Sequence, residues 1–109
     1  MSYSVKVTPK FEKNLKKLAK KYHSLKIEFT DLVNSLKEKP KQGTSLGSNC
    51  YKIRLAIVSK GKGKSGGSRV ITNFVVAENT AFLLSIYDKA DKENLTDKEL
   101  KELLKEVPK

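Results

Sequence analysis

Cationic residues and glycines crowd one stretch of the chain, SKGKGKSGGSR, from Ser59 to Arg69. It contains four glycines, three lysines and one arginine, and no carboxylate. Glycine allows a backbone to approach a ligand closely, and ammonium groups attract phosphate. The stretch is therefore suited to phosphate binding, and the question is whether that phosphate belongs to a nucleotide or to a nucleic-acid backbone.

A nucleoside-triphosphate loop requires a Gly, four residues, then Gly-Lys-Ser or Gly-Lys-Thr, with a helix directly afterwards. Gly63-Lys64-Ser65 supplies the end of that pattern, but the first glycine would fall at Val58. The residues that follow, RVITNFVV, are rich in β-branched side chains and predict a strand. The nucleotide site is therefore rejected. A cationic hairpin connection remains, which is either a solvated loop or a contact for a nucleic-acid backbone.

The composition points to an anionic partner. The 109 residues carry 23 Lys and Arg against 12 Asp and Glu, a net charge of +11 with a pI near 9.8. A small protein this basic meets nucleic acid, an anionic membrane face or an acidic protein, although most of its lysines form a solvated surface.

No apolar run reaches the ~20 residues of a membrane span, and the start shows no export signal. Cys50 is the single cysteine and is expected to be buried. We expect a cytoplasmic protein.

Hydrophobic periodicity predicts one α+β domain over residues 1–109, with the order β-α-α-β-β-β-α. Alternation predicts strands in segments 2–7, 51–59, 69–77 and 80–87. Apolar stripes predict helices in segments 8–22, 25–39 and 94–107. Thr8 and Pro9 start the first helix, and Thr96 and Glu99 form a capping box for the last. We expect a helical hairpin and a carboxyl-terminal helix packed on a small antiparallel sheet.

The alternation also sorts the strands by face. The face expected to pack on the helices carries Tyr51, Ile53, Leu55, Ile57, Val70, Phe74, Val76, Phe82, Leu84 and Ile86. The opposite, open face then carries Lys52, Arg54, Arg69, Asn73, Ser85 and Tyr87, with Lys89 continuing the parity and Ile71 and Leu83 among the polar residues. This assignment depends on register, because a slip of one residue reverses the faces of a strand.

Four cations and a tyrosine on one face suit RNA. An Arg clamps phosphate oxygens in a fork, and a Tyr stacks on an unpaired base. RNA is cut when its 2′-hydroxyl attacks the adjacent phosphate, which requires a base, cations for the charge on phosphorus and an acid for the leaving oxygen. This reaction requires no metal or other cofactor, and a Lys crowded by cations could act as the base.

A catalytic histidine and a metal site are less well supported by the sequence. His23 stands in the joint between the first two helices, far along the chain from the basic strands, and is expected to be an exposed turn residue. We predict no metal site, since there is no second His and no Cys pair, and Asp88 and Asp91 lack partners.

The segments YKIRLAIVSKGKGKSGGSRVI and LLSIYDKAD resemble the RelE/ParE superfamily of bacterial toxins, most closely its RelE-type and HigB-type members. The segments FEKNLKKLAKKY and LKEKPKQGTSLG are similar to the helical hairpin and linker of that family. The resemblance implies a RelE-like fold and a toxin of a type II toxin–antitoxin system. It also implies an endoribonuclease that cuts messenger RNA in the ribosomal decoding site without a metal and so inhibits translation. Its partners would be ribosome, messenger RNA and a cognate antitoxin with a DNA-binding part.

The resemblance further implies roles for single residues. Arg54 and Arg69 would stabilise charge on the phosphorane, Tyr87 would stack on or position a base, and Lys89 would contact phosphate or assist proton transfer. RNA would be bound by Lys52, Lys60, Lys62 and Lys64. Some related toxins use a His near the cut phosphate, and this chain has none there, so the group that transfers the proton stays open.

Two alternatives to the ribonuclease remain. One is a toxin of the ParE kind, which shares the fold and poisons DNA gyrase without enzymatic activity. The other is an RNA-binding module without chemistry. The cluster of Arg54, Arg69 and Tyr87 favours the ribonuclease over the gyrase poison, because gyrase poisoning needs no such cations.

Overall fold

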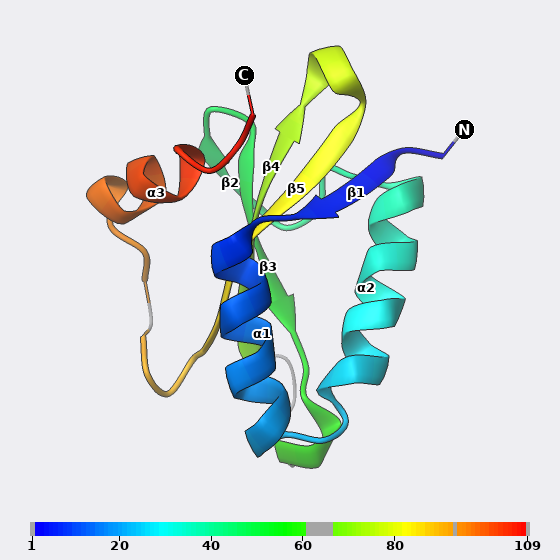
Figure 1. Cartoon of the computed structure of the whole chain (residues 1–109), viewed down its shortest axis with the longest axis vertical. Helices are drawn as coiled ribbons and strands as arrows, with labels where there is room; N and C mark the ends of the chain where they lie inside the picture. Colours follow the sequence, from blue (N-terminus) through cyan, green and yellow to red (C-terminus); the bar gives the residue numbers. More distant parts are fainter. Residues whose placement is uncertain (1, 61–66, 93, 109) are drawn as a thin grey trace.

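Within residues 2–60, 67–92 and 94–108, which the structure describes, three α-helices pack on a five-stranded sheet in this computed structural model (Figure 1). The strand order is β1-β5-β4-β3-β2. The strands β3 (Cys50–Leu55), β4 (Ser68–Val75) and β5 (Thr80–Asp88) form the predicted antiparallel meander. No helix in these ranges is long and apolar enough to span a bilayer.

The sheet is mixed and has one strand more than predicted. β1 (Ser4–Val7) runs parallel to β5, so the expectation of a wholly antiparallel sheet is wrong. β2 (Thr44–Gly47) pairs antiparallel with β3 at the other edge. Four residues, TSLG, are too few to show an alternation, and the order of elements is therefore β-α-α-β-β-β-β-α.

The helical hairpin consists of α1 (Pro9–Lys21) and α2 (Leu25–Glu38), as predicted. The hydroxyl of Thr8 accepts a hydrogen bond from the Phe11 N–H at 3.2 Å and caps α1, while Pro9 occupies its first turn. The same hydroxyl lies 3.2 Å from the carbonyl oxygen of Leu83 and donates to it. The start of α1 is thereby tied to the middle of β5.

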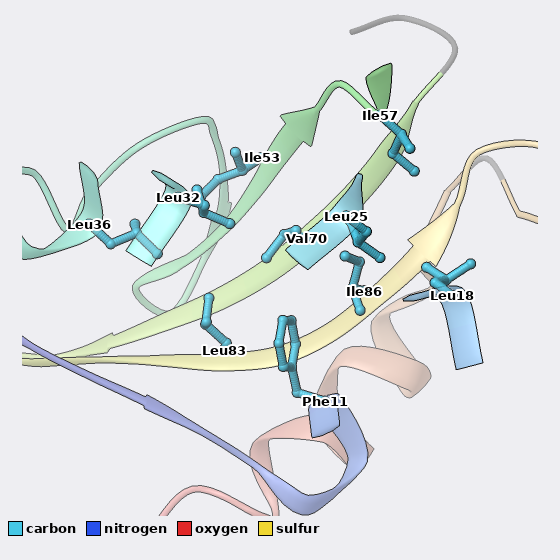
Figure 2. Packing of buried hydrophobic residues seen from close by; sticks show 10 residues of the cluster. All are labelled: Phe11, Leu18, Leu25, Leu32, Leu36, Ile53, Ile57, Val70, Leu83 and Ile86. Atoms are coloured by element: carbon cyan, nitrogen blue, oxygen red, sulfur yellow. The ribbon is translucent and has the colours of Figure 1, made fainter. Parts of the chain in front are cut away.

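A core of buried residues joins the hairpin to one face of the sheet (Figure 2). It consists of Phe11, Leu18, Leu25, Leu32, Leu36, Ile53, Ile57, Val70, Leu83 and Ile86. The predicted assignment of Ile53, Ile57, Val70 and Ile86 to the helix-covered face is therefore confirmed.

A β-bulge in β5 changes the facing of its first half. Ser85 lies opposite Ile71, but Leu83 lies opposite Thr72, so Leu84 is an extra residue on β5. Leu83 consequently packs in the hairpin core, and its expected place among the polar residues is wrong. Uniform alternation does not allow for an extra residue and therefore cannot predict this change of facing.

The opposite face is covered by α3 (Asp97–Leu104) along part of its length. Leu103 packs there with Ile71, Phe82 and Leu84. The assignment of Phe82 and Leu84 to the hairpin side is therefore wrong, because Leu84 forms the bulge and Phe82 precedes it. The predicted capping box of α3 is confirmed, with Thr96 and Glu99 hydrogen-bonded to each other's backbone N–H.

Two short 3-10 helices end the central strands earlier than predicted. β3 ends at Leu55 and is followed by η1 (Val58–Lys60), while β4 ends at Val75 before η3 (Val76–Glu78). Val76 is 59% exposed, so its assignment to the core is wrong. Asn79 adopts a left-handed conformation with φ of 48°, which turns the chain into β5 in the two-residue gap between the predicted strands.

A prediction concerns Gly43, directly before β2, and Gly47, the last residue of β2. Gly43 has φ of +91°, and a Cβ built there would lie 2.3 Å from the Lys52 carbonyl oxygen; Gly47 has φ of +86° with open space around it. Gly47→Ala should lose about 1–2 kcal/mol of unfolding free energy, the cost of a left-handed conformation in a residue with a Cβ. Gly43→Ala should lose more, because β2 must also move away from β3. Urea unfolding of both variants measures the difference, and equal losses would show that the close approach has no energetic weight.

Candidate functional site

One row across the sheet brings together Arg54, Arg69 and Tyr87, which we call the arginine row. Arg54 of β3 lies opposite Arg69 of β4, and Arg69 lies opposite Tyr87 of β5. Residues directly opposite in an antiparallel pair point to the same face, with Cβ atoms about 4.5–5.5 Å apart. The arginine row therefore lies on the face away from the hairpin core, as the alternation predicts.

The members of the row differ in exposure. Arg54 is exposed and Tyr87 is half-buried, whereas Arg69 is only 5% exposed. The Arg69 Nη1 donates a hydrogen bond to the Ser68 carbonyl oxygen at 3.1 Å. The expectation of an open face is therefore wrong for Arg69, and also for Asn73 and Ser85, which are buried. The packing of α3 on Ile71 and its neighbours, which alternation does not predict, closes part of this face.

The phenol of Tyr87 is affected by burial and by its neighbour in the row. Burial raises the pKa of Tyr87, and the positive charge of Arg69 opposes that rise by favouring the phenolate. The hydroxyl oxygen is buried and has no hydrogen-bond partner among the described residues. An unsatisfied buried hydroxyl is unfavourable by about 1–3 kcal/mol. At neutral pH the phenol is therefore protonated and has an unused hydrogen-bonding group.

Two cavities adjoin Tyr87. The larger, of about 400 Å³, lies between α1 and α3 over β5, and we call it the α1–α3 cavity. Its lining includes Lys10, Asn14, Ser85, Tyr87, Lys92, Leu95, Lys98 and Leu103. The smaller cavity, of about 300 Å³, is lined by Lys17, Lys21, Asp88 and Asp91, and shares Asn14 and Tyr87 with the first. Asn14 is not among the predicted site residues, because an isolated amide on a Lys-rich helix belongs to no sequence motif.

Asp88 holds the end of β5 in place. Its carboxylate is buried and accepts hydrogen bonds from the Tyr22 hydroxyl at 2.7 Å and from the Ala90 N–H at 2.9 Å. The Lys89 N–H donates to the Gly67 carbonyl oxygen at 3.1 Å. These contacts fix the chain immediately after Tyr87, and Lys89 is half-buried just beyond the strand. The sequence offered Asp88 only as a metal ligand without partners, whereas the structure gives it a backbone-fixing contact.

The remaining predicted cations are divided between the sheet and the glycine-rich stretch. Lys52 is half-buried and precedes Arg54 by two residues, so both point to one face of β3. Lys60 ends η1, and Lys62 and Lys64 lie outside the described residues. The stretch is followed by β4 and not by a helix, in agreement with the rejection of a nucleotide loop.

The start of the glycine-rich stretch is attached to the helical hairpin. The Ser59 N–H donates to Ser24 Oγ at 2.9 Å, and the Val58 N–H donates to the Glu28 carboxylate at 2.5 Å. His23, beside this contact, is exposed as predicted. Cys50 is buried as expected, and burial raises the pKa of its thiol. Among the described residues, no three His, Cys, Asp or Glu side chains gather as metal ligands.

Solved structures of toxins share this fold. A mutant of the E. coli toxin RelE in the free state aligns with a TM-score of 0.63 at 17% identity, covering 99% of this chain and 100% of that chain. The intact E. coli RelBE toxin–antitoxin complex aligns with a TM-score of 0.62 at 19% identity, covering 80% of this chain and 96% of that chain. The RelBE2 toxin–antitoxin complex of Mycobacterium tuberculosis aligns with a TM-score of 0.54 at 18% identity, covering 84% of this chain and 95% of that chain. At these identities the likeness shows a RelE-like α+β fold.

The family of this chain is shown by a match between its sequence and a family model. The model of the RelE toxin of the RelE/RelB toxin–antitoxin system matches residues 11–109. The chain therefore belongs to the RelE toxin family of toxin–antitoxin systems, and the resemblance found in its strands and glycine-rich stretch is confirmed.

A prediction follows from the charge beside Tyr87. Arg69→Gln removes the positive charge that favours the phenolate, so it should raise the pKa of Tyr87 further above its usual value. NMR titration of ¹³C-labelled tyrosine rings measures this pKa. Arg54→Gln is the matched control, because the exposed Arg54 is screened by water and should leave that pKa nearly unchanged. A lower Tyr87 pKa in Arg69→Gln would contradict the interaction.

Proposed function

We propose that this toxin is a ribosome-dependent endoribonuclease that cleaves messenger RNA in the decoding site by metal-independent attack of a 2′-hydroxyl. The observation that carries the proposal is the arginine row, in which Arg54, Arg69 and Tyr87 share one face of the sheet. Membership of the RelE toxin family and the net charge of +11 support an RNA substrate.

The members of the row have different tasks in this proposal. Arg54 is exposed and contacts the scissile phosphate directly, stabilising the charge that develops on its oxygens. Arg69 is buried and acts as a fixed positive charge beside it, because a guanidinium keeps its proton even in a desolvated site. Tyr87 stacks on a base next to the cut through its half-buried ring.

The reaction transfers two protons and exchanges one bond to phosphorus. The 2′-oxygen bonds to phosphorus as its proton passes to a base, and the bond to the 5′-oxygen breaks as that oxygen receives a proton from an acid. The products are a 2′,3′-cyclic phosphate and a 5′-hydroxyl. We assign Lys89 to the phosphate or to one of these proton transfers, because the Gly67 contact holds its backbone beside the row.

The other lysines and the partners complete the proposal. Lys52, Lys60, Lys62 and Lys64 bind messenger or ribosomal RNA by neutralising phosphates. The RelBE complexes of E. coli and M. tuberculosis contain a toxin together with its antitoxin, which supports a cognate antitoxin for this chain. We expect a DNA-binding part in that antitoxin from the family resemblance alone. Cleavage on ribosomes assigns the toxin to the cytoplasm.

A prediction tests the row in vitro. Arg54→Ala should reduce the rate of messenger cleavage by about 100- to 1000-fold, the usual effect of removing one transition-state donor. Because Arg54 is exposed, circular dichroism and thermal unfolding should stay close to those of the parent chain. The measurement maps RNA ends on programmed ribosomes. Lys13→Ala on α1 is the control, because it removes the same charge from an exposed position outside the row.

Undiminished cleavage by Arg54→Ala would refute the proposed role of the row. Growth arrest by the parent chain without codon-placed cuts, but with gyrase-dependent DNA breaks, would establish the ParE-like alternative. Ribosome binding without cuts or breaks would establish an RNA-binding module.

A further inference from the structure

We propose that the α1–α3 cavity is a nucleobase pocket in which Asn14 determines which base is accepted beside the cut. The proposal rests on the proposed ribonuclease function and adds a specificity residue to it. Asn14 belongs to α1, more than fifty positions before Tyr87 in the chain, and the fold alone brings the two to one cavity.

The amide of Asn14 is held in a defined orientation. Ser85 of β5 is buried, and its Oγ donates to Asn14 Oδ1 at 3.0 Å. The hydroxyl therefore occupies one of the two lone pairs of that oxygen. The Nδ2 group makes no hydrogen bond within the described parts of the chain, so the half-buried amide has two N–H donors and one acceptor position unused.

The cavity has the chemistry that a nucleotide requires. Its volume of about 400 Å³ falls within the range of ligand sites, and Tyr87, Leu95 and Leu103 line it with apolar surface for a flat ring. Tyr87 contributes its ring to this lining, while its hydroxyl is buried and has no hydrogen-bond partner among the described residues.

The charges at the cavity favour a phosphate beside that base. Two carboxylates line the cavity but are engaged, Glu99 with Lys92 and Glu102 with Lys105 at 3.0 Å. Lys10 and Lys98 are exposed and form no ion pair within the described residues. Two uncompensated ammonium groups at the edge of an apolar pocket suit the phosphate of a nucleotide whose base lies inside.

An Asn side chain distinguishes bases by the pattern of donors and acceptors along their edges. Asn14→Asp tests this directly, because it keeps the oxygen that Ser85 binds and replaces the NH₂ donor by an acceptor oxygen. The negative charge that it adds acts on the phosphate of every nucleotide alike, so the order of base preference is the quantity that reports on the lost donor. The parent chain should prefer a base whose edge presents an acceptor atom to the Asn14 NH₂ group. The variant should prefer a base whose edge presents an amino group to the new carboxylate. A residue that only supported the fold would change the rate for every base alike.

The experiment measures single-turnover cleavage by the full-length toxin on programmed ribosomes whose decoding-site codon contains each base at each position. The parent chain should discriminate at one position next to the cut. Asn14→Asp should change the order of preference there by on the order of 10- to 100-fold. Lys98→Ala is the comparison variant and should slow cleavage of all codons equally, because a phosphate contact carries no sequence information.

A second variant protects the test against a folding defect in the first. Ser85→Ala releases the amide, so discrimination at the same position should become narrower without reversing. If folded Asn14→Asp or folded Ser85→Ala retains the base order and spread of the parent chain, the role of Asn14 is refuted while the ribonuclease stands. If the parent chain cuts no codon, the ribonuclease itself is refuted and the pocket with it.

Discussion

The candidate site depends on the register between β3, β4 and β5, and that register is held by apolar contacts on both faces of β4. Val70 and Ile71 are consecutive and both fully buried, one in the hairpin core and the other under α3. A slip of one residue would exchange them between two differently shaped environments. Arg69, directly before them, can therefore point only toward the face of α3, where it meets Arg54 and Tyr87.

This constraint places a permanent charge in a poorly hydrated position. A guanidinium that is 5% exposed loses most of its hydration, and such a loss is tolerated when polar groups surround the charge. The electrostatic effect reaches Tyr87, since the charge of Arg69 favours the phenolate. Preorganised charge of this kind stabilises a charged transition state well, because it needs no rearrangement during the reaction. Arg54, in contrast, is exposed to water, and in the proposed ribonuclease it would follow a bound strand of RNA.

The sequence predicted the parts of the structure that rest on regular periodicity. The stripes from Phe11 to Tyr22 and from Leu25 to Leu36 gave the hairpin, and alternation gave the arginine row. Prediction from the sequence failed where a single extra residue or a contact between distant segments determines which face a side chain occupies. The extra Leu84 reverses Phe82 and Leu83, and TSLG is too short for a pattern. The burial of Arg69 and the position of Asn14 beside Tyr87 are set by tertiary packing, which no local pattern predicts.

The parallel pairing of β1 with β5 joins two segments from distant parts of the chain. Val7 lies opposite Leu83, and the Thr8 hydroxyl donates to the carbonyl of the same Leu83. Closing so long a loop is entropically unfavourable, so β1 has no partner strand until β5 is available. During translation, a nascent chain still lacking β5 has an unpaired edge on β4 and no Tyr87 beside Arg69. The arginine row is therefore complete only after that strand has emerged from the ribosome.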